Sequence, residues 1–277
     1  MDTRFSNIEW TDVTWNVAVG CTKVSPGCKH CYMMRDFGGR FSREVNGTVT
    51  RTKPGTFLKP LNWQAQKRTS PDGRRMKVFT SSLTDVFHPA IDEYRDEIWE
   101  IIRGCPDLDF QILTKRPERV LDNLPGDFSP EKFPNVWMGV SVESQDQLER
   151  IEILGRIPAR VKFASFEPLI GFINMDEFAA TSMGVYKDDW RMVHRFRLDW
   201  AIIGGESGND SGPWGYRPCE LDWIKDLVDQ LDMRGVKTFV KQTGTHLAKE
   251  LGISRHGKVM EEWPEQIQIR EFPEQYR

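Results

Sequence analysis

Short apolar runs recur along the chain, and each is followed by a stretch with helical periodicity. The runs end in polar or small residues, as strands do in parallel sheets. Together with the alternating stretch at 8–20, they predict seven strands, the others lying at 78–82, 110–114, 136–142, 161–166, 200–204 and 238–241. Strands that alternate with helices predict an α/β fold with a parallel sheet, closed or partly closed into a TIM-type (β/α) barrel.

This alternation of strands and helices predicts one barrel over residues 1–243, with two insertions. It ends before the C-terminal segment, which has no further strand–helix pair. The first insertion, 35–77, is basic, and the second, at about 176–197, is rich in Met and charged residues. We expect residues 244–277 to form a tail packed on the barrel, either under its bottom or at its mouth.

Composition limits the setting of the protein. No apolar run among the 277 residues is long enough to cross a bilayer, so no membrane partner is expected. The chain has five cysteines, an odd number, and no signal-peptide pattern, which disfavours disulfides and indicates a reducing cytoplasm.

Charge is uneven along the chain. The net charge is −3, yet the insertion at 35–77 holds eleven Lys/Arg and three acidic residues, an excess of 11 − 3 = +8. Its cations include Arg40, Arg43, Arg51, Lys53, Lys59, Lys67, Arg68, Arg74 and Arg75. Interleaved with Phe41, Phe57 and Trp63, they suit a nucleic-acid backbone with stacked bases. The alternative is a solvated insertion whose aromatic rings pack on the domain.

Three cysteines, Cys21, Cys28 and Cys31, follow the first predicted strand with the spacing Cys-x6-Cys-x2-Cys. Three thiolates without a fourth ligand suit an iron–sulfur cluster in which one iron stays open to a small molecule. The alternative is a zinc knuckle with a distant fourth ligand, such as Cys105, Cys219 or His30. Otherwise Cys105 and Cys219, which stand alone, are expected to be small apolar residues.

Polar residues follow every later strand. They are Ser81, Ser82, Thr84 and Asp85, then Thr114, Lys115 and Arg116, then Ser141 and Glu143, then Glu167, then Glu206, and finally Lys241 and Gln242. Each alone could cap a helix or end a strand in solvent. Because carboxyl ends of parallel strands meet at one mouth, together they predict a site that includes the cysteine loop.

The cysteine loop resembles that of the radical S-adenosylmethionine (SAM) superfamily, with three more residues in the first gap than the usual Cys-x3-Cys-x2-Cys. Thr84-Asp85 in SSLTDVFHP, Lys115 in FQILTKRPERV and Ser141 in WMGVSVES look like SAM-contacting positions of its spore photoproduct lyase branch. The resemblance implies that these four residues contact SAM and that the three cysteines bind a 4Fe-4S cluster. The residue types agree, since an ammonium and a hydroxyl suit the methionyl carboxylate and a carboxylate suits its ammonium.

A second resemblance covers nearly the whole chain. The segments WNVAVGCTKVSPGCKHCY, ILTKRPER, VWMGVSVES, FEPLIG, IIGGESG and FVKQTG are similar to the phage-borne three-cysteine-motif family of radical SAM-like proteins. Its members in phages that hypermodify thymine move a glycine on the thymine methyl carbon from attachment through nitrogen to attachment through the alpha carbon. The resemblance implies an isomerase of glycinyl-thymidine in DNA, which would protect viral DNA from host restriction.

That resemblance also implies partners and residue roles. SAM cleavage needs an electron donor such as a flavodoxin or ferredoxin, and a base in duplex DNA must leave the stack to reach the mouth. Candidates for catalysis are Lys115, with Arg116 and Lys241 for the glycyl carboxylate, and Glu143, Glu167 and Glu206 for the amine or the SAM ribose. Two alternatives stay open: another radical SAM reaction on nucleic acid, as in repair lyases, and a non-catalytic zinc-containing nucleic-acid-binding protein.

Overall fold

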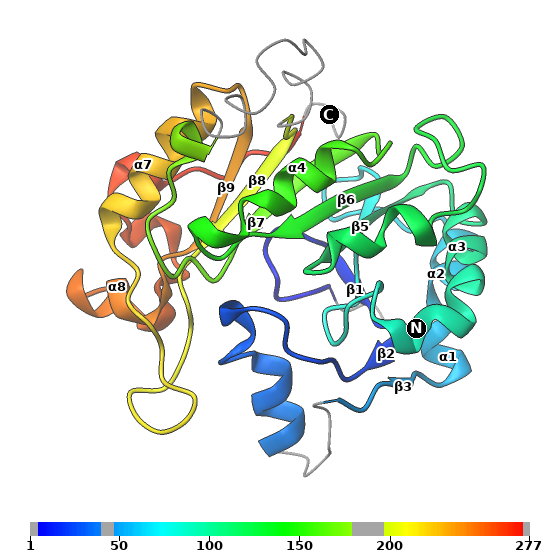
Figure 1. Ribbon diagram of the computed structural model, residues 1–277, viewed down its shortest axis with the longest axis horizontal. Coiled ribbons are helices and arrows are strands. Elements are labelled where there is room, and N and C mark those ends of the chain that lie inside the picture. Colours follow the sequence, from blue (N-terminus) through cyan, green and yellow to red (C-terminus); the bar gives the residue numbers. More distant parts are fainter. Residues whose placement is uncertain (1–4, 40–46, 179–196, 274–277) are drawn as a thin grey trace. The chain divides into compact units, whose positions relative to one another are not determined.

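A computed structural model describes residues 5–39, 47–178 and 197–273 (Figure 1). Seven strands form a sheet in the order β1-β4-β5-β6-β7-β8-β9, which is also their order along the chain. The pairs β1–β4, β4–β5, β7–β8 and β8–β9 are parallel. These strands are β1 (Val13–Trp15), β4 (Met76–Thr80), β5 (Leu108–Thr114), β6 (Val136–Ser141), β7 (Val161–Phe166), β8 (Trp200–Gly204) and β9 (Lys237–Gln242). The predicted α/β class is confirmed, with the strand order of a partial TIM-type barrel.

Helices follow most of the strands. The α-helices are α1 (Pro54–Phe57), α2 (Lys59–Ala65), α3 (Arg95–Arg103), α4 (Glu149–Gly155), α7 (Leu221–Asp232) and α8 (Gly244–Glu250). A π-helix, η2 (Met34–Gly39), follows the cysteine loop. Short 3-10 helices are η1 (Pro26–Cys28), η3 (Pro89–Tyr94), η4 (Pro117–Arg119), η5 (Leu121–Asn123), η6 (Gln145–Gln147), η7 (Arg255–Gly257), η8 (Met260–Glu262) and η9 (Glu265–Ile267). All residues of β4, β6 and β8 are buried, as expected for strands covered on both faces.

The first predicted strand, 8–20, is wrong as a single element. Only β1 joins the seven-stranded sheet, whereas β2 (Ala18–Val19) pairs antiparallel with β3 (Thr50–Arg51). Asn16 explains the break, because its Oδ1 accepts hydrogen bonds from the backbone N–H of Leu83 (3.0 Å) and the hydroxyl of Ser82 (3.2 Å). The chain therefore leaves the sheet after β1, before it reaches the cysteine loop.

Two compact units make up the chain. Unit 1 comprises Met1–Val24, Cys31–Gly139 and Ile157–Arg160, and unit 2 comprises Ser25–His30, Val140–Arg156 and Val161–Arg277. In unit 1, the Trp15 ring packs edge-on against Phe57 and Phe110, at centroid distances of 6.2 and 5.7 Å. In unit 2, Trp200 stacks on Phe272 at 5.4 Å, and α7 packs on β8 and β9 (Figure 1). Each unit thus has its own aromatic core.

The C-terminal segment begins with α8 and returns along β9. The backbone N–H of Val240 donates to the carbonyl of Ile269 (2.8 Å), and that of Glu271 donates to the carbonyl of Thr238 (2.9 Å). Because β9 is the last strand of the sheet, the segment covers an edge that would otherwise leave backbone groups unpaired. The tail therefore pairs with this edge.

Some predicted segments lie outside the described residues. They are residues 179–196 of the second insertion, and Arg40, Phe41 and Arg43 of the basic insertion. None of the helices in the described parts of the chain has the length and apolarity that crossing a bilayer requires.

Candidate functional site

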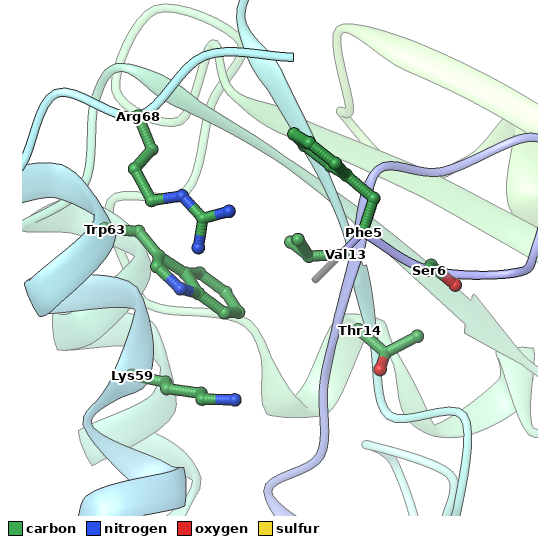
Figure 2. Close-up of a pocket in the computed structure, with 7 residues that line it drawn as sticks. All are labelled: Phe5, Ser6, Val13, Thr14, Lys59, Trp63 and Arg68. Atoms are coloured by element: carbon green, nitrogen blue, oxygen red, sulfur yellow. The ribbon is translucent and has the colours of Figure 1, made fainter. Parts of the chain in front are cut away.

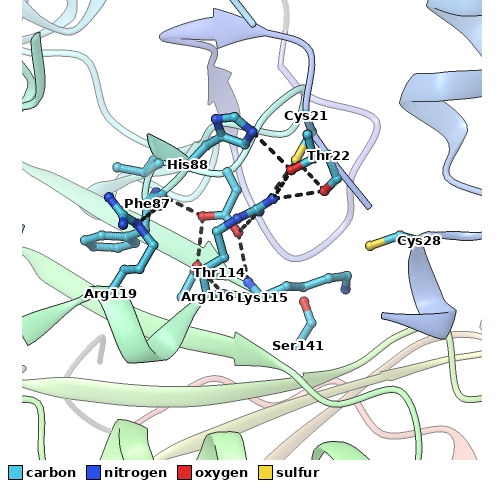
Figure 3. Close-up of polar contacts among 12 residues, drawn as sticks. Cys21, Thr22, Cys28, Phe87, His88, Thr114, Lys115, Arg116, Arg119 and Ser141 are labelled. Atoms are coloured by element: carbon cyan, nitrogen blue, oxygen red, sulfur yellow. Dashed lines mark hydrogen bonds and ion pairs between the residues drawn. The ribbon is translucent and has the colours of Figure 1, made fainter. Parts of the chain in front are cut away.

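In unit 1, Cys21 lies against a guanidinium from the end of β5 (Figure 3). Nη1 of Arg116 is 3.7 Å from Cys21 Sγ and 3.0 Å from Asp85 Oδ2, and Nη2 donates to the Thr22 hydroxyl at 2.7 Å. Burial favours a neutral guanidinium, but the Asp85 carboxylate and Cys21 outweigh it and raise the pKa of Arg116 above its ordinary value. A fixed positive charge beside a sulfur stabilises the thiolate, which is the form that binds metals.

Asp85 accepts four hydrogen bonds from the residues around Arg116. Its Oδ1 accepts from the Thr114 hydroxyl (2.8 Å) and the Phe87 N–H (2.9 Å). Its Oδ2 accepts from the Lys115 N–H and from Arg116, both at 3.0 Å. A carboxylate offers about four lone-pair sites, so the protein fills them all. Asp85 therefore ties the ends of β4 and β5 together, and its contact with SAM stays a prediction.

His88 contacts Thr22, which also accepts a hydrogen bond from Arg116. Its Nδ1 accepts a hydrogen bond from the Ala90 N–H (3.1 Å), so the neutral ring carries its hydrogen on Nε2, 3.1 Å from the Thr22 hydroxyl. Burial, and then the positive charge of Arg116, lower the pKa of His88 below its ordinary value. The imidazole thus adds no second positive charge beside Arg116 at neutral pH.

Two buried hydroxyls at the end of β4, on Ser81 and Thr84, have no hydrogen-bond partner within the described residues. Ser81 also has a φ of 71°, a left-handed conformation that costs a non-glycine residue about 1–2 kcal/mol. A buried polar group without a partner costs a further 1–3 kcal/mol or so. Such groups suit a ligand that brings polar atoms to the strand end, and the contact between Thr84 and SAM stays a prediction.

In unit 2, Glu143 anchors the middle of the cysteine loop. It is completely buried, its Oε1 accepts from the Ser25 hydroxyl (2.6 Å), and its Oε2 pairs with Arg150 Nη1 (2.9 Å). The same Arg150 nitrogen donates to the carbonyl of Ser141 at 2.7 Å. A Cβ on Gly27 would lie 2.3 Å from the Glu143 carboxylate, so the loop approaches this side chain as closely as only glycine allows.

Glu206 anchors the same loop from the end of β8. Its Oε2 lies 3.1 Å from His30 Nδ1 and accepts from both the backbone N–H and Nε of Arg217 at 2.9 Å. The Arg217 side chain also donates to the carbonyl of Pro26 at 2.8 Å. Burial favours the neutral acid, but hydrogen bonds from Arg217 and His30 outweigh it and lower the pKa of Glu206. Both carboxylates thus hold loop residues through ionic hydrogen bonds.

Glu167, at the end of β7, forms a different kind of pair. Its Oε1 lies 2.5 Å from Lys241 Nζ, and Gln242 Nε2 is 3.4 Å from the same oxygen. The Glu167 and Lys241 side chains are 19% and 18% exposed, whereas Glu143 is completely buried. Because both partners keep exposed surface, an ammonium or carboxylate of a substrate can reach this pair.

All five cysteines are free thiols, but they fall into two groups. Cys21, Cys28 and Cys31 are half-buried, whereas burial raises the pKa of Cys105 to about 11 and that of Cys219 to about 12. The last two are protonated at neutral pH, as expected for small apolar residues.

The three half-buried cysteines match an iron–sulfur cluster in their chemistry. Across residues 5–39, 47–178 and 197–273, no three His, Cys, Asp or Glu side chains are grouped closely enough to hold a metal ion. The match consists instead of three free thiols within eleven residues of chain, with a guanidinium beside one of them. Three thiolates are the donor set that leaves one iron of such a cluster open.

The basic insertion is more neutral than its sequence suggests. Arg51 forms a bidentate pair with Glu97 at 2.8 and 2.6 Å, and Arg75 pairs with Asp109 at 2.9 Å. Two of its aromatic rings pack on the domain, as the alternative of a solvated insertion predicted, since Phe57 and Trp63 are only 1% and 5% exposed. DNA binding by this segment stays a prediction.

Several residues that hold the loop carry no signal in the sequence. Ser25 and Glu143 are 118 residues apart, and Pro26 and Arg217 are 191 apart. Ser25, Pro26 and Arg217 look ordinary in their own segments, Glu143 is visible only as a polar residue after a strand, and only the folded chain pairs them. The polar residues after the strands indicated which segments lie near the cysteine loop. They did not indicate that Glu143 and Glu206 would form hydrogen bonds with the loop itself.

The fold and site define an α/β protein with a parallel sheet, in which charged residues after the strands hold a loop with three free cysteines. A model of a family described as proteins of unknown function, DUF5131, matches residues 5–272. The chain therefore belongs to the DUF5131 family. No curated protein and no solved structure matches the chain.

Proposed function

We propose that the protein is a radical SAM isomerase that acts on modified thymine in DNA and converts N-linked to C-linked glycinyl-thymidine. It would work in the cytoplasm of a phage-infected cell, where the modification protects viral DNA from restriction. The observation that carries the proposal is the loop of three free, half-buried thiols, held by buried ionic residues from the strand ends.

Cys21, Cys28 and Cys31 would hold the 4Fe-4S cluster, and Thr84, Lys115 and Ser141 would contact SAM. Asp85, predicted as a fourth contact, already accepts four hydrogen bonds from the protein and would instead hold the ends of β4 and β5 in place for SAM. With one electron from a flavodoxin or ferredoxin, these cofactors supply an organic radical that takes a hydrogen atom from carbon. The unpaired Thr84 hydroxyl supports this assignment, because it lacks a partner that SAM would provide.

The chain's own residues keep the cysteine loop in place during such a reaction. Arg116 donates to the Thr22 carbonyl at 2.9 Å and stabilises the Cys21 thiolate. Glu143 and Glu206 hold Ser25 and His30. We therefore assign Arg116, Glu143 and Glu206 to positioning the loop. The roles that the sequence suggested, the glycyl carboxylate for Arg116 and the amine or the SAM ribose for the two glutamates, are less economical, because the hydrogen bonds of these side chains already go to the protein.

Lys241 and Glu167 are the residues that we assign to the substrate. Lys241 Nζ would hold the glycyl carboxylate, and Glu167 would accept a hydrogen bond from the glycyl nitrogen. In the isomerisation, a hydrogen atom leaves the glycine alpha carbon, and the bond from the thymine methylene to nitrogen breaks. A bond from the methylene to the alpha carbon forms, and hydrogen returns to nitrogen, so product and substrate have the same mass.

The test is an anaerobic reaction of the reconstituted, reduced protein with an oligonucleotide that carries glycine N-linked to a thymine methyl carbon. After digestion to nucleosides, chromatography with tandem mass spectrometry should show a new nucleoside of unchanged mass that no longer fragments at the methylene–nitrogen bond. Cys28→Ala should form none. If wild type cleaves SAM but leaves the nucleoside unchanged, the isomerase assignment is wrong and another radical reaction takes its place.

A further inference from the structure

In unit 2, the part of the cysteine loop at Ser25–His30 is connected to the end of β6 through a side chain of α4 that the sequence did not indicate. Nη1 of Arg150 donates to the carbonyl of Ser141, the last residue of β6, at 2.7 Å and to Oε2 of Glu143 at 2.9 Å. The Arg150 side chain is only 10% exposed, and that of Glu143 is completely buried. One nitrogen therefore connects the backbone of the strand end with a buried carboxylate.

The Glu143 carboxylate contacts the loop with its other oxygen. Oε1 accepts from the Ser25 hydroxyl at 2.6 Å, and a Cβ on Gly27 would lie 2.3 Å from the same oxygen. Because Oε2 is bound to Arg150, the carboxylate cannot rotate without losing an ionic hydrogen bond in a buried place. The guanidinium thus fixes which oxygen faces the loop.

Ser25 lies beside a cysteine of the loop. Its Oγ is 3.9 Å from Cys28 Sγ, and it directly precedes η1, at the position where a serine usually accepts a hydrogen bond from a backbone N–H of the helix. Among the described residues, its side chain makes no such capping bond, and its hydroxyl donates to Glu143. The beginning of η1 is therefore held by a distant carboxylate in place of a local cap.

We propose that Arg150 is a positioning residue for the cysteine loop. By holding Glu143 it fixes Ser25, and Ser25 fixes the sulfur of Cys28. A buried ion pair adds little net stability, because the desolvation of both charges offsets their attraction. It does supply a fixed geometry, which a loop that presents a metal ligand needs. That Cys28 binds a cluster rests on the proposed function, whereas the hold on the loop does not.

The test measures hydrogen exchange by mass spectrometry in metal-free protein, at the N–H groups of Cys28 and Lys29. In the folded loop they donate to the carbonyls of Ser25 (2.9 Å) and Pro26 (3.1 Å), so they exchange when the loop opens. The variants are Arg150→Gln, Arg150→Lys, Ser25→Ala and the double variant Arg150→Gln/Ser25→Ala. The buried strand β8 is the internal reference for more general unfolding.

Two control variants separate loop positioning from general effects. Arg156→Gln removes the arginine directly after α4, whose side chain is 50% exposed and pairs with Glu152. Val13→Ala truncates a side chain of unit 1 that is 4% exposed, and Figure 2 shows Val13 among the residues that line a cavity of about 170 Å³ beside Trp63. This truncation lowers stability, which thermal unfolding measures. Both controls should leave the exchange of the loop unchanged.

Arg150→Gln should speed the exchange about tenfold, the change expected for the loss of one hydrogen bond to a charged group. Ser25→Ala should have a similar effect, and the double variant should add little to it, because both changes break the same chain of contacts. Arg150→Lys should keep most of the protection, since a single nitrogen makes both bonds and an ammonium can replace it. Unchanged exchange in Arg150→Gln, effects that multiply in the double variant, or an equal rise in β8 or in Val13→Ala would each overturn the proposal.

A buried charge without its partner can prevent folding, and Arg150→Gln leaves Glu143 in that state. The variant Arg150→Gln/Glu143→Gln, which removes both charges, is therefore measured as well. It should also speed the exchange of the loop, because an amide pair holds no fixed orientation of this strength. Exchange as slow as in wild type would overturn the proposal in the same way.

A second measurement follows the metal. After reconstitution, the rate at which a chelator removes iron should rise in Arg150→Gln and stay as in wild type in Arg156→Gln. If exchange of the loop speeds up while iron loss does not, the role of Arg150 in holding Cys28 is wrong. Because exchange is measured without metal, a failure of the proposed radical chemistry is not confused with a failure of this proposal.

Discussion

Gly27 lies directly against the carboxylate of Glu143, at a separation that leaves no room for a side chain. A Cβ at position 27 would be 2.3 Å from both the Cγ and the Oε1 of Glu143, which is completely buried. The position follows Pro26 in η1 and directly precedes Cys28. Access of the cysteine loop to its place beside the strand ends therefore depends on this glycine.

We predict that Gly27→Ala destabilises the protein by about 1–3 kcal/mol, because the methyl group must push the loop away from a buried ion pair. Urea unfolding measures the loss, and the iron content after anaerobic reconstitution should fall as well. Gly126→Ala is the matched control, since nothing lies within 4 Å of the added methyl and its φ is not left-handed. Equal stability and iron content in the two variants would show that the close approach has no importance.

Thiol reactivity should divide the cysteines into the two groups. In metal-free, reduced protein, iodoacetamide should modify Cys21, Cys28 and Cys31, while the buried Cys105 and Cys219 react only after denaturation. Peptide mass spectrometry over time measures each site. Early modification of the buried pair in folded protein would contradict this division.

Arg116→Gln should slow the modification of Cys21 specifically, because it removes the positive charge 3.7 Å from that sulfur. Arg119→Gln is the control for a neighbouring arginine, whose guanidinium donates to the Phe87 carbonyl (2.8 Å) and pairs with Asp92. If both variants slow Cys21 equally, the effect comes from general charge and not from the contact.

His88 should make stability depend on pH below about 6.5. Its pKa in the folded protein is lowered by burial and by Arg116, so below about pH 6.5 the unfolded chain binds a proton that the folded protein does not. Stability therefore falls as the pH decreases through this range. In His88→Gln, the free energy of unfolding measured with urea should depend less steeply on pH between about pH 5 and 7.5. His246→Gln, at a side chain 25% exposed beside Glu250, should keep the pH dependence of wild type.

Lys241→Met tests the substrate assignment. It should lower kcat/KM for the modified oligonucleotide by about 10- to 150-fold, the loss expected for a hydrogen bond to a charged group worth about 1.5–3 kcal/mol. Iron content and SAM cleavage without substrate should be unchanged. Lys237→Met on the same strand, where the lysine pairs with Glu271 at 3.1 Å, is the control. A loss of iron in Lys241→Met would instead give this lysine a structural role.

The sequence predicted the sheet well because buried parallel strands have a local signature. The runs at 161–166 and 200–204 coincide with β7 and β8, and the other strands that follow β1 in the seven-stranded sheet lie within two residues of their predicted bounds. The short strand β3 was not predicted. The exception, the stretch at 8–20, has the right alternation. Its interruption depends on the Asn16 side chain, which bonds to residues 66 and 67 positions further along. A local pattern cannot contain that information.

The candidate site was predicted only in part, because local spacing is visible in the sequence and distant partners are not. The three cysteines and the polar strand ends are visible as spacing and as position after a strand, and the structure pairs Glu167 with Lys241 and Asp85 with Arg116. The partners of Glu143 and Glu206 come from distant segments, so their hold on the loop emerges only from the fold. The charges of Arg51 and Arg75 also looked available because Glu97 and Asp109 lie far from them in sequence.

The most direct test of the account is anaerobic purification and reconstitution of wild type and Cys28→Ala, followed by iron and sulfide analysis, an absorption spectrum, and reduction with SAM. We predict about four irons per wild-type chain with a brown chromophore, loss of both in the variant, and 5′-deoxyadenosine from wild type alone. One zinc per chain, no chromophore and no 5′-deoxyadenosine would contradict the account and leave a zinc-containing binding protein.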